Sequence, residues 1–217
     1  MGEASVLMTG PNVGRLDRSD EELLQDTAAG DLQAFDVIVR RYRDRLLNFV
    51  FRFLGDRTAA EDVVQETFLR VFRKSGEFHA SARFSTWLFT IAGNLAKSEL
   101  RRRKRWRFTS LGWNEDVEQH VEIPDERPHP DALAETEIAT EAIQKAIESL
   151  PPNHRQVVIL SDIQGMAYEE IAQIVGCPVG TVKSRINRGR LRLQKKLERL
   201  GYLPGSMEAE LKVKNEK

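Results

Sequence analysis

The 217-residue sequence contains a single cysteine, Cys177, and only four histidines. One cysteine excludes an internal disulfide and any zinc site built from several cysteines; we interpret Cys177 as structural, with redox sensing as the second interpretation. The histidines are scattered without metal-ligand spacing, and neither a phosphate-binding loop nor a nucleophile elbow is present. We therefore expect no metal, no cofactor, no small-molecule substrate and no enzymatic activity.

Long apolar segments are also missing. No segment approaches the roughly 18 consecutive apolar residues that a membrane span requires. Residues 1–15 lack the basic start, apolar centre and cleavage site of a secretory signal. With 41% apolar and 30% charged residues, the composition is typical of a globular protein with one or two packed domains. We expect this protein to stay in the cytoplasm.

The sequence has no strand-like alternation and no internal repeat, and helical periodicity predicts an all-α fold. Capping boxes formed by Ser19 with Glu22 and by Thr58 with Glu61 predict two helix starts, and Asp31 predicts a third. The expected helices begin near residues 19, 31, 59, 85, 132, 153, 168 and 178.

The chain is organised around the stretch from Tyr168 to Arg188. Gly176 predicts the end of one helix, because glycine adopts the left-handed conformation at little cost. Pro178 then suits the first position of a second helix, where its missing N–H is no loss. Small Ala172 and apolar Val182 allow the two helices to pack closely. This pattern predicts a helix-turn-helix, whose second helix enters the major groove of DNA.

The charge of this second helix favours the same interpretation. Lys and Arg neutralise phosphates, whereas Lys, Ser, Asn and Arg side chains can hydrogen-bond base edges. The alternative is a solvated basic helix within a helical bundle. Only Glu198 opposes the cations Lys183, Arg185, Arg188, Arg190, Arg192, Lys195, Lys196 and Arg199.

The net charge of zero conceals a segregation of the two signs. Residues 97–107 contain seven Lys or Arg against Glu99 alone, whereas residues 114–137 contain nine acids and one Arg. Two basic blocks separated by an acidic connector indicate two places that contact phosphate. The alternative is that these charges only line solvated faces. The prolines in 107–131 favour a linker and a domain boundary there.

Two expected helices carry faces that invite a partner. In the helix from residue 59, an acidic stripe with one leucine lies away from the apolar face; it consists of Asp62, Gln65, Glu66 and Leu69. This stripe is either solvent surface or a site for a basic partner helix. The helix from residue 85 is aromatic first and basic later, which suits single-stranded nucleic acid. The alternative interpretation of Trp87 and Phe89 in that helix is that they are buried core residues.

Five motifs follow one another along the chain. They are Asp31–Phe35, Ala60–Phe68, Phe84–Leu88 with Ile91–Asn94, Ser149–Pro151, and Tyr168–Ala172 through Gly180–Arg185. In this order they resemble the sigma-70 family of bacterial transcription initiation factors, specifically the extracytoplasmic-function (ECF), sigma-E-like group. The resemblance implies two small helical domains joined by a flexible linker: sigma region 2 in residues 19–106, the linker in 107–131 and sigma region 4 in 132–200.

The resemblance also implies partners and site residues. It assigns binding of core RNA polymerase to Asp62, Gln65, Glu66 and Leu69. It assigns melting and recognition of the −10 promoter element to Phe78, Phe84, Trp87, Asn94, Lys97, Arg101 and Arg102. It assigns readout of the −35 duplex to Thr181, Lys183, Ser184, Arg185, Asn187 and Arg188. Ala167 stands where Ser or Thr commonly caps the helix, which costs about 1 kcal/mol of local stability.

Two further expectations concern regulation and the competing function. Two exposed cationic faces invite control, so we expect an anti-sigma factor to cover them, and a membrane-bound one would hold the protein at the inner face of the membrane. The rival hypothesis is a stand-alone helix-turn-helix repressor or activator. It explains residues 132–200 but leaves the acidic stripe and the aromatic-basic helix unused.

Overall fold

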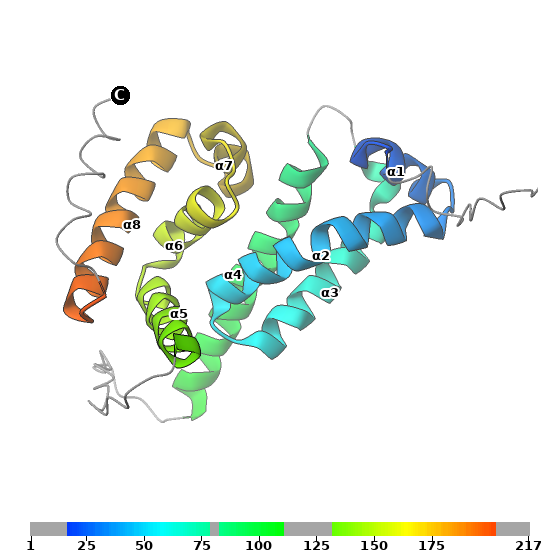
Figure 1. The fold of residues 1–217 in the computed structure, drawn as a ribbon. Coiled ribbons are helices and arrows are strands. Elements are labelled where there is room, and N and C mark those ends of the chain that lie inside the picture. The colour runs from blue at the N-terminus through cyan, green and yellow to red at the C-terminus, as the bar shows by residue number, and fades with distance from the viewer. Residues whose placement is uncertain (1–16, 79–82, 111–131, 203–217) are drawn as a thin grey trace, which may run out of the picture.

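The computed structural model describes residues 17–78, 83–110 and 132–202, with the side chains of 107–110 and 132–138 left out of the description. Helices account for nearly all of these ranges, and no strand occurs within them (Figure 1). The predicted all-α fold is confirmed. Within the same ranges, no helix combines the length and the apolar character needed to cross a membrane.

The N-terminal half contains four α-helices and a short 3₁₀ turn. Helix α2 lies at its centre and packs against α1, α3 and α4, while α3 also packs against α4. The largest fully buried side chains of this half are the rings of Phe49, Phe53, Phe84 and Phe89. The elements are α1 (Asp20–Ala28), α2 (Leu32–Leu54), α3 (Arg57–Arg73), η2 (Ser75–Glu77) and α4 (Phe84–Ser110).

Two of the predicted helix starts are confirmed and one is wrong. Ser19 and Glu22 form both hydrogen bonds of a capping box, and the Asp31 carboxylate caps α2. Helix α3 is capped by Asp56, whose carboxylate accepts from the backbone N–H of Ala59 at 2.9 Å, and not by Thr58. Asp56 is favoured over Thr58 as the N-cap because its negative charge also interacts favourably with the helix dipole.

The C-terminal half packs around α8, which contacts α5, α6 and α7. Here the single helix expected from residue 153 to 162 is an α-helix that continues into a π-helical turn. The elements are α5 (Ala132–Glu148), α6 (Pro152–Val158), η3 (Ile159–Ile163), α7 (Tyr168–Val175) and α8 (Val179–Arg199).

Helices α7 and α8 form the predicted helix-turn-helix. Gly176 has a φ of 67° and donates its N–H to Ala172 O at 2.9 Å, which ends α7 in the left-handed conformation. Pro178 is the residue immediately before α8 and not its first residue. As expected, Ala167 offers no side-chain cap; the Glu170 carboxylate instead accepts from the Ala167 N–H at 3.1 Å.

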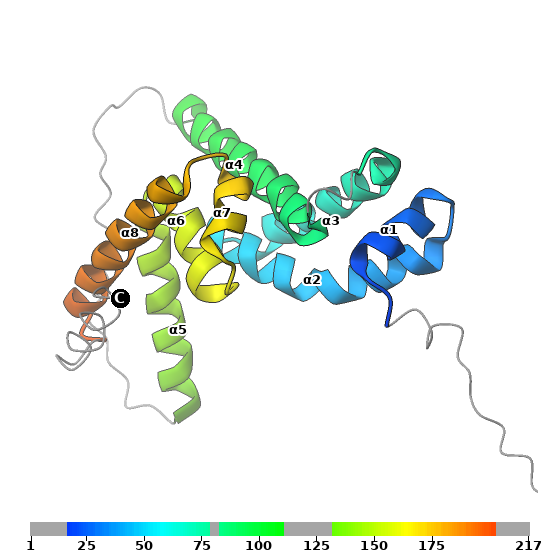
Figure 2. The same cartoon turned by 90° about the horizontal axis from the view of Figure 1, so that it is seen from above.

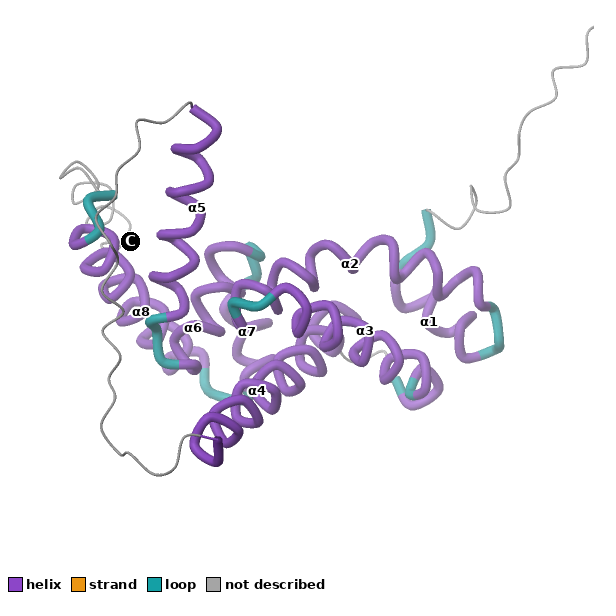
Figure 3. The backbone as a smooth tube through the Cα atoms, turned by 90° about the horizontal axis from the view of Figure 1, so that it is seen from below, coloured by secondary structure: helices purple, strands orange, loops and turns teal. Residues whose placement is uncertain are grey.

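The predicted two helical domains are present, and they also pack against each other. Helix α7 packs along α4, and α5, α6 and η3 contact α2 (Figure 2). The buried side chains of both halves belong to one continuous hydrophobic cluster. The N-terminal part of α5 projects away from the other helices (Figure 3). Apolar patterns within single helices could not predict this packing, because periodicity indicates which face of a helix is buried and not which other helix covers it.

Candidate nucleic-acid and protein interfaces

Helix α3 presents the acidic stripe on the surface. Asp62 and Gln65 are exposed, and Leu69 keeps 43% of its surface exposed. Glu66 is half-buried, and its carboxylate pairs with Arg70 one turn later at 2.7 Å. The apolar face of the same helix, which includes Val64 and Phe68, points inward. The stripe is therefore a surface available to a partner.

A groove runs beside this stripe between α2 and α3. It has a volume of about 400 Å³, and its lining combines an apolar floor with a rim of mainly acidic and polar residues. Such a groove suits a helix that offers apolar side chains flanked by basic ones. The lining residues are Val39, Arg43, Leu47, Glu61, Asp62, Val64, Gln65 and Phe68.

Three aromatic side chains gather at the start of α4. The Phe78 ring lies 5.2 Å from the Trp87 ring and 6.3 Å from the Phe84 ring, measured between centroids. Phe78 and Trp87 are half-buried and keep part of their rings accessible. Phe84 is 0% exposed and packs edge-on against Tyr42, so it anchors the cluster from beneath and offers no face to a ligand.

Further along α4, the candidate polar residues differ in exposure. Asn94 is exposed, and Lys97 one turn later is half-buried. Burial lowers the pKa of the Lys97 ammonium, and the positive charges of Arg185 and Arg101 lower this pKa further. Arg101 is exposed and donates to the Ser98 hydroxyl at 3.1 Å. A free anion such as a phosphate would relieve this concentration of positive charge.

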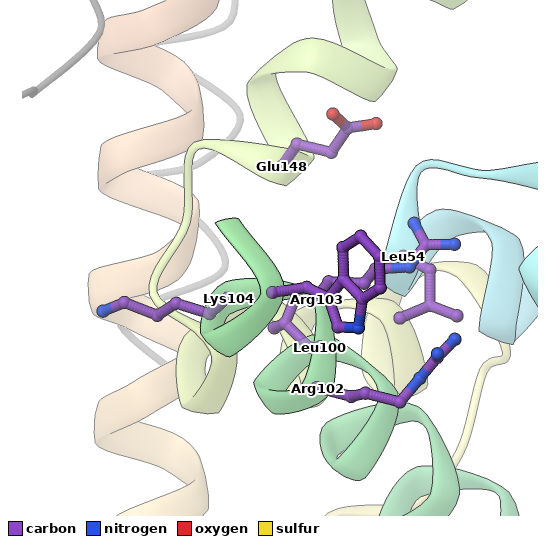
Figure 4. A pocket seen from close by; sticks show the side chains of 7 residues that line it. Leu54, Leu100, Arg102, Arg103, Lys104 and Glu148 are labelled. Carbon is purple, nitrogen blue, oxygen red and sulfur yellow. The ribbon is translucent and has the colours of Figure 1, made fainter. Parts of the chain in front are cut away.

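The basic end of α4 borders a cleft with a volume of about 820 Å³. Arg102 forms two hydrogen bonds with the Glu99 carboxylate, whereas Trp106 is 72% exposed. Figure 4 shows the Glu148 carboxylate across the opening from the side chains of α2 and α4. The lining residues are Leu54, Leu100, Arg102, Arg103, Lys104, Trp106 and Glu148.

Helix α8 turns its predicted reading residues outward. Val182 and Ile186 are fully buried, so the residues between them fall on the opposite face. Four of the candidates are exposed and two are partly exposed. The exposed ones are Lys183, Ser184, Asn187 and Arg188, and the partly exposed ones are Thr181 and Arg185.

Not every cation of α8 is available to DNA. The Arg190 guanidinium binds both carboxylate oxygens of Asp162, at 2.6 and 3.0 Å, and thereby ties α8 to the π-helical turn. Arg185 lies close to the helix-turn-helix turn, with its Nη1 3.6 Å from the Cys177 sulfur. His154 lies beneath this helix, where burial and the charges of Arg192 and other arginines lower its pKa.

The positive charge of Arg185 in the C-terminal half helps to lower the pKa of Lys97 in the N-terminal half, so these two DNA candidates lie near each other although they belong to different halves. The acidic stripe lies on α3 in the N-terminal half. No cluster of three or more His, Cys, Asp or Glu side chains that could hold a metal ion occurs in the part of the chain that the structure describes.

The residues that join the two halves were missed by sequence reasoning. Arg155 is buried at 7% exposure and donates to the carbonyl oxygen of Phe53 in α2 at 2.7 Å. Gly93 in α4 faces Gln156 in α6 so closely that a Cβ atom there would lie 2.5 Å from the amide nitrogen of that side chain. An isolated glycine inside a helical pattern was the available signal, since it indicates a close approach of another backbone or side chain.

Comparison with known proteins agrees with this architecture. The sigma-70 region 2 family matches residues 38–106, and the sigma-70 region 4 family matches residues 140–193. The RNA polymerase sigma-H factor of Pseudomonas aeruginosa is 37% identical over 185 residues, covering 83% of this chain and 95% of that protein. The chain belongs to the sigma-70 family.

Two other relatives narrow the group. The ECF RNA polymerase sigma factor SigW of Bacillus subtilis is 35% identical, covering 82% of this chain and 96% of that protein. The structure of the sigma factor RpoE of Bartonella quintana, solved with the anti-sigma factor NepR, superposes with a TM-score of 0.60 at 30% identity, covering 77% of this chain and 98% of that chain. This sigma-70 family member is of the ECF type, and the stand-alone repressor or activator is not favoured.

Proposed function

We propose that this ECF sigma factor binds core RNA polymerase and directs it to promoters by opening the −10 element and reading the −35 element. One observation carries the proposal: a chain of this family presents an acidic and apolar groove on α3, an aromatic and basic helix α4, and an outward-facing reading surface on α8. A stand-alone regulator needs only the last of these. It carries out no catalytic step of its own, and we place it in the cytoplasm, where core polymerase works.

The α3 stripe serves as the polymerase site in this proposal. Asp62 and Gln65 line the groove between α2 and α3, and Leu69 continues the exposed stripe. Carboxylates around an apolar floor match a basic amphipathic helix of the polymerase. Glu66 is held by Arg70 in the free chain, so an incoming cation competes with this ion pair for the carboxylate.

We assign opening and recognition of the −10 element to the aromatic cluster and to the polar and basic residues that follow it on α4. Half-buried Phe78 and Trp87 offer ring surface on which an unstacked base can stack, a contact worth about 1–3 kcal/mol per base. Buried Phe84 holds these rings in place. Asn94, Lys97 and Arg101 follow on α4 and supply hydrogen bonds and positive charge to the separated strand. Arg102 contributes when a phosphate of the strand displaces the Glu99 carboxylate that its guanidinium binds in the free chain.

The −35 function falls to α8 as the recognition helix. Lys183, Ser184, Asn187 and Arg188 are exposed and can reach base edges or phosphates in a major groove. Thr181 and Arg185 stand at the margin of this surface. Arg190 is excluded from it, because its guanidinium is engaged by Asp162.

Regulation by an anti-sigma factor is part of the proposal. It is supported by the likeness to RpoE, which was solved in complex with the anti-sigma factor NepR. Such a partner would cover one or both cationic faces until a signal releases it. A membrane-bound anti-sigma factor would in addition hold the protein at the inner face of the membrane.

A reconstitution with core polymerase tests the proposed function against the rival. Mobility shift on genomic fragments is measured for the protein alone, core alone and the mixture, and fragments retained by the mixture are footprinted. We expect specific footprints that cover both elements with the mixture only. Tight, specific binding by the protein alone, unchanged by core polymerase, would support a stand-alone regulator and refute the proposal.

A further inference from the structure

Helix α1 contacts the chain both before and after the aromatic cluster of Phe78, Phe84 and Trp87. It packs against η2, the short 3₁₀ turn that leads directly into Phe78. In addition, Glu21 in its first turn accepts a hydrogen bond from the backbone N–H of Phe84, the first residue of α4, with 3.0 Å between Phe84 N and Glu21 Oε1. Helix α1 therefore holds the start of the helix to which we assign −10 recognition.

The Glu21 carboxylate satisfies a group that α4 cannot satisfy by itself. The first four N–H groups of an α-helix have no acceptor within the helix. A carboxylate at this end accepts a charge-assisted hydrogen bond and also interacts favourably with the positive end of the helix dipole. Because Glu21 is half-buried, solvent and salt screen this contact only in part. The contact fixes the position of the first turn of α4.

The carboxylate next to Glu21 ties the same turn of α1 to α2. Asp20 accepts hydrogen bonds from the Tyr42 hydroxyl and from the Arg41 guanidinium, the latter at 2.7 Å. The Tyr42 ring packs edge-on against the Phe84 ring, with their centroids 5.3 Å apart. Since Asp20 and Glu21 are consecutive, these contacts form a closed ring through α1, α2 and α4. The ring holds Phe84 by its backbone and by its side chain.

Phe84 in turn supports the two accessible rings of the cluster. The centroid of its ring lies 6.3 Å from that of Phe78 and 6.2 Å from that of Trp87. Phe84 is 0% exposed, whereas Phe78 and Trp87 are half-buried. A binding site has to be held within about 0.5 Å of its productive geometry by supporting packing and hydrogen bonds. A shift of Phe84 is therefore expected to displace the surface on which a base stacks.

We propose that Glu21 is a positioning residue for −10 recognition: its carboxylate fixes Phe84 and thereby keeps the Phe78 and Trp87 rings where an unstacked base can stack on them. Glu21 itself does not contact the DNA. The proposal rests on the proposed function, since it concerns the −10 surface of the same protein. A cap that only stabilised the fold would leave the affinity of the folded protein for the separated strand unchanged.

Three variants of the full chain separate positioning from stability. Glu21→Ala removes the acceptor of the Phe84 N–H, whereas Glu21→Gln keeps an oxygen acceptor and loses only the charge. The matched control is Glu22→Ala, which removes the adjacent carboxylate of the same turn. That carboxylate accepts from the Ser19 N–H at 2.9 Å and so acts within the start of α1. Urea unfolding confirms that each variant is folded at the temperature of the binding assay.

The measurement is the affinity of each holoenzyme for a fluorescent single strand that covers the −10 element of a genomic fragment footprinted by the wild-type holoenzyme. We expect Glu21→Ala to weaken binding about tenfold, or about 1.4 kcal/mol, which lies within the range for one base stacked on a ring. Glu21→Gln should stay within about threefold of wild type, because a neutral acceptor keeps about half the strength of a charged one. Glu22→Ala is expected to bind the strand as wild type does, and core affinity is expected to be unchanged in all three.

A double-mutant cycle tests whether Glu21 acts through the two rings. Phe78→Leu with Trp87→Leu removes the stacking surface but keeps apolar side chains over Phe84. In this ringless chain, we expect Glu21→Ala to change the affinity for the strand by less than about twofold, because residues that act through one another are not additive. If Glu21→Ala does not fold, Glu21→Gln takes its place in the cycle, and its smaller loss should vanish in the same way.

Three results contradict the proposal. A loss with Glu21→Ala that persists in the ringless chain shows that Glu21 acts by another route. An equal loss with Glu22→Ala shows that only the stability of α1 matters. Wild-type affinity of Glu21→Ala shows that Phe84 is held without the carboxylate. If the wild-type holoenzyme itself binds neither the strand nor any fragment, the proposed function fails, and the role of Glu21 fails with it.

Discussion

Replacement of Arg155 by methionine perturbs the residue that links the ends of two helices. Its guanidinium donates to Phe53 O at the end of α2, to Leu150 O at 3.1 Å, and to Glu148 O at the end of α5. Carbonyl groups in the last turn of a helix have no partner within the helix. Methionine keeps an unbranched apolar side chain of similar length but cannot donate to any of them.

The expected loss can be estimated from these contacts. A hydrogen bond to a charged group contributes about 1.5–3 kcal/mol, so three of them contribute about 4.5–9 kcal/mol before offsets. Burial of the guanidinium, which lowers the pKa of Arg155, opposes this gain, and its Nε has no partner. The Glu148 carbonyl, whose contact with Arg155 is only partly buried, also regains water in the variant. We therefore expect Arg155→Met to lower the free energy of unfolding by about 2–4 kcal/mol.

Urea unfolding followed by circular dichroism measures this difference. The matched control is Arg52→Met. Arg52 lies at the end of α2, next to the Phe53 carbonyl that Arg155 of α6 binds, and its side chain makes one half-buried hydrogen bond, to Gln144. We expect this substitution to lower the free energy of unfolding by about 1 kcal/mol or less. Equal effects of the two substitutions would show that the carbonyl contacts of Arg155 add nothing, and would refute the reasoning.

Three other predictions address the surfaces and the pH dependence. Asp62→Arg with Glu66→Arg is expected to abolish binding to core polymerase while leaving urea unfolding unchanged; wild-type core affinity would rule out the α3 site. Arg188→Ala is expected to weaken use of promoters with a matching −35 base by about 1–3 kcal/mol. The effect of Arg190→Ala on transcription should be the same for every −35 sequence. An equal loss on every promoter with Arg188→Ala would make Arg188 a phosphate contact. The hydrogen bond that the Asp56 carboxylate accepts from the backbone N–H of Ala59 holds the pKa of Asp56 below its ordinary value of 3.8. The carboxylate therefore stabilises the fold fully above pH 3.8, and this contribution is lost as the pH falls through the lowered pKa. Asp56→Asn should flatten the acid limb of the stability profile, and an unchanged limb would contradict this role.

Helix starts and ends were largely predictable because their causes are local. Ser19 with Glu22 and Asp31 each satisfy N–H groups within four residues along the chain, and Gly176 ends α7 through its own φ angle. The error at α3 arose where two good capping residues, Asp56 and Thr58, stand two positions apart. Aspartate is the stronger N-cap of the two, because its charge also interacts favourably with the helix dipole, and the cap is the aspartate.

The sequence could not predict the exposure of every candidate site residue. Phe84 matches an aromatic motif as well as Trp87 does, yet it is buried because α1 and α2 cover the first turn of α4. Arg190 and Arg188 are equally cationic on one helix. They differ because Asp162, 28 residues earlier, folds back against Arg190 only.

Taken by itself, the sequence determined the helices, the helix-turn-helix, the segregation of charge and the family, since each depends on residue types at short spacing. Tertiary structure alone decided which cations are neighbours across the molecule and which are neutralised. It also decided that Arg155 and Gly93 join the halves, because contacts between residues 53 and 155 or 93 and 156 depend on how packed helices meet. Periodicity along the chain does not predict which helices make these contacts.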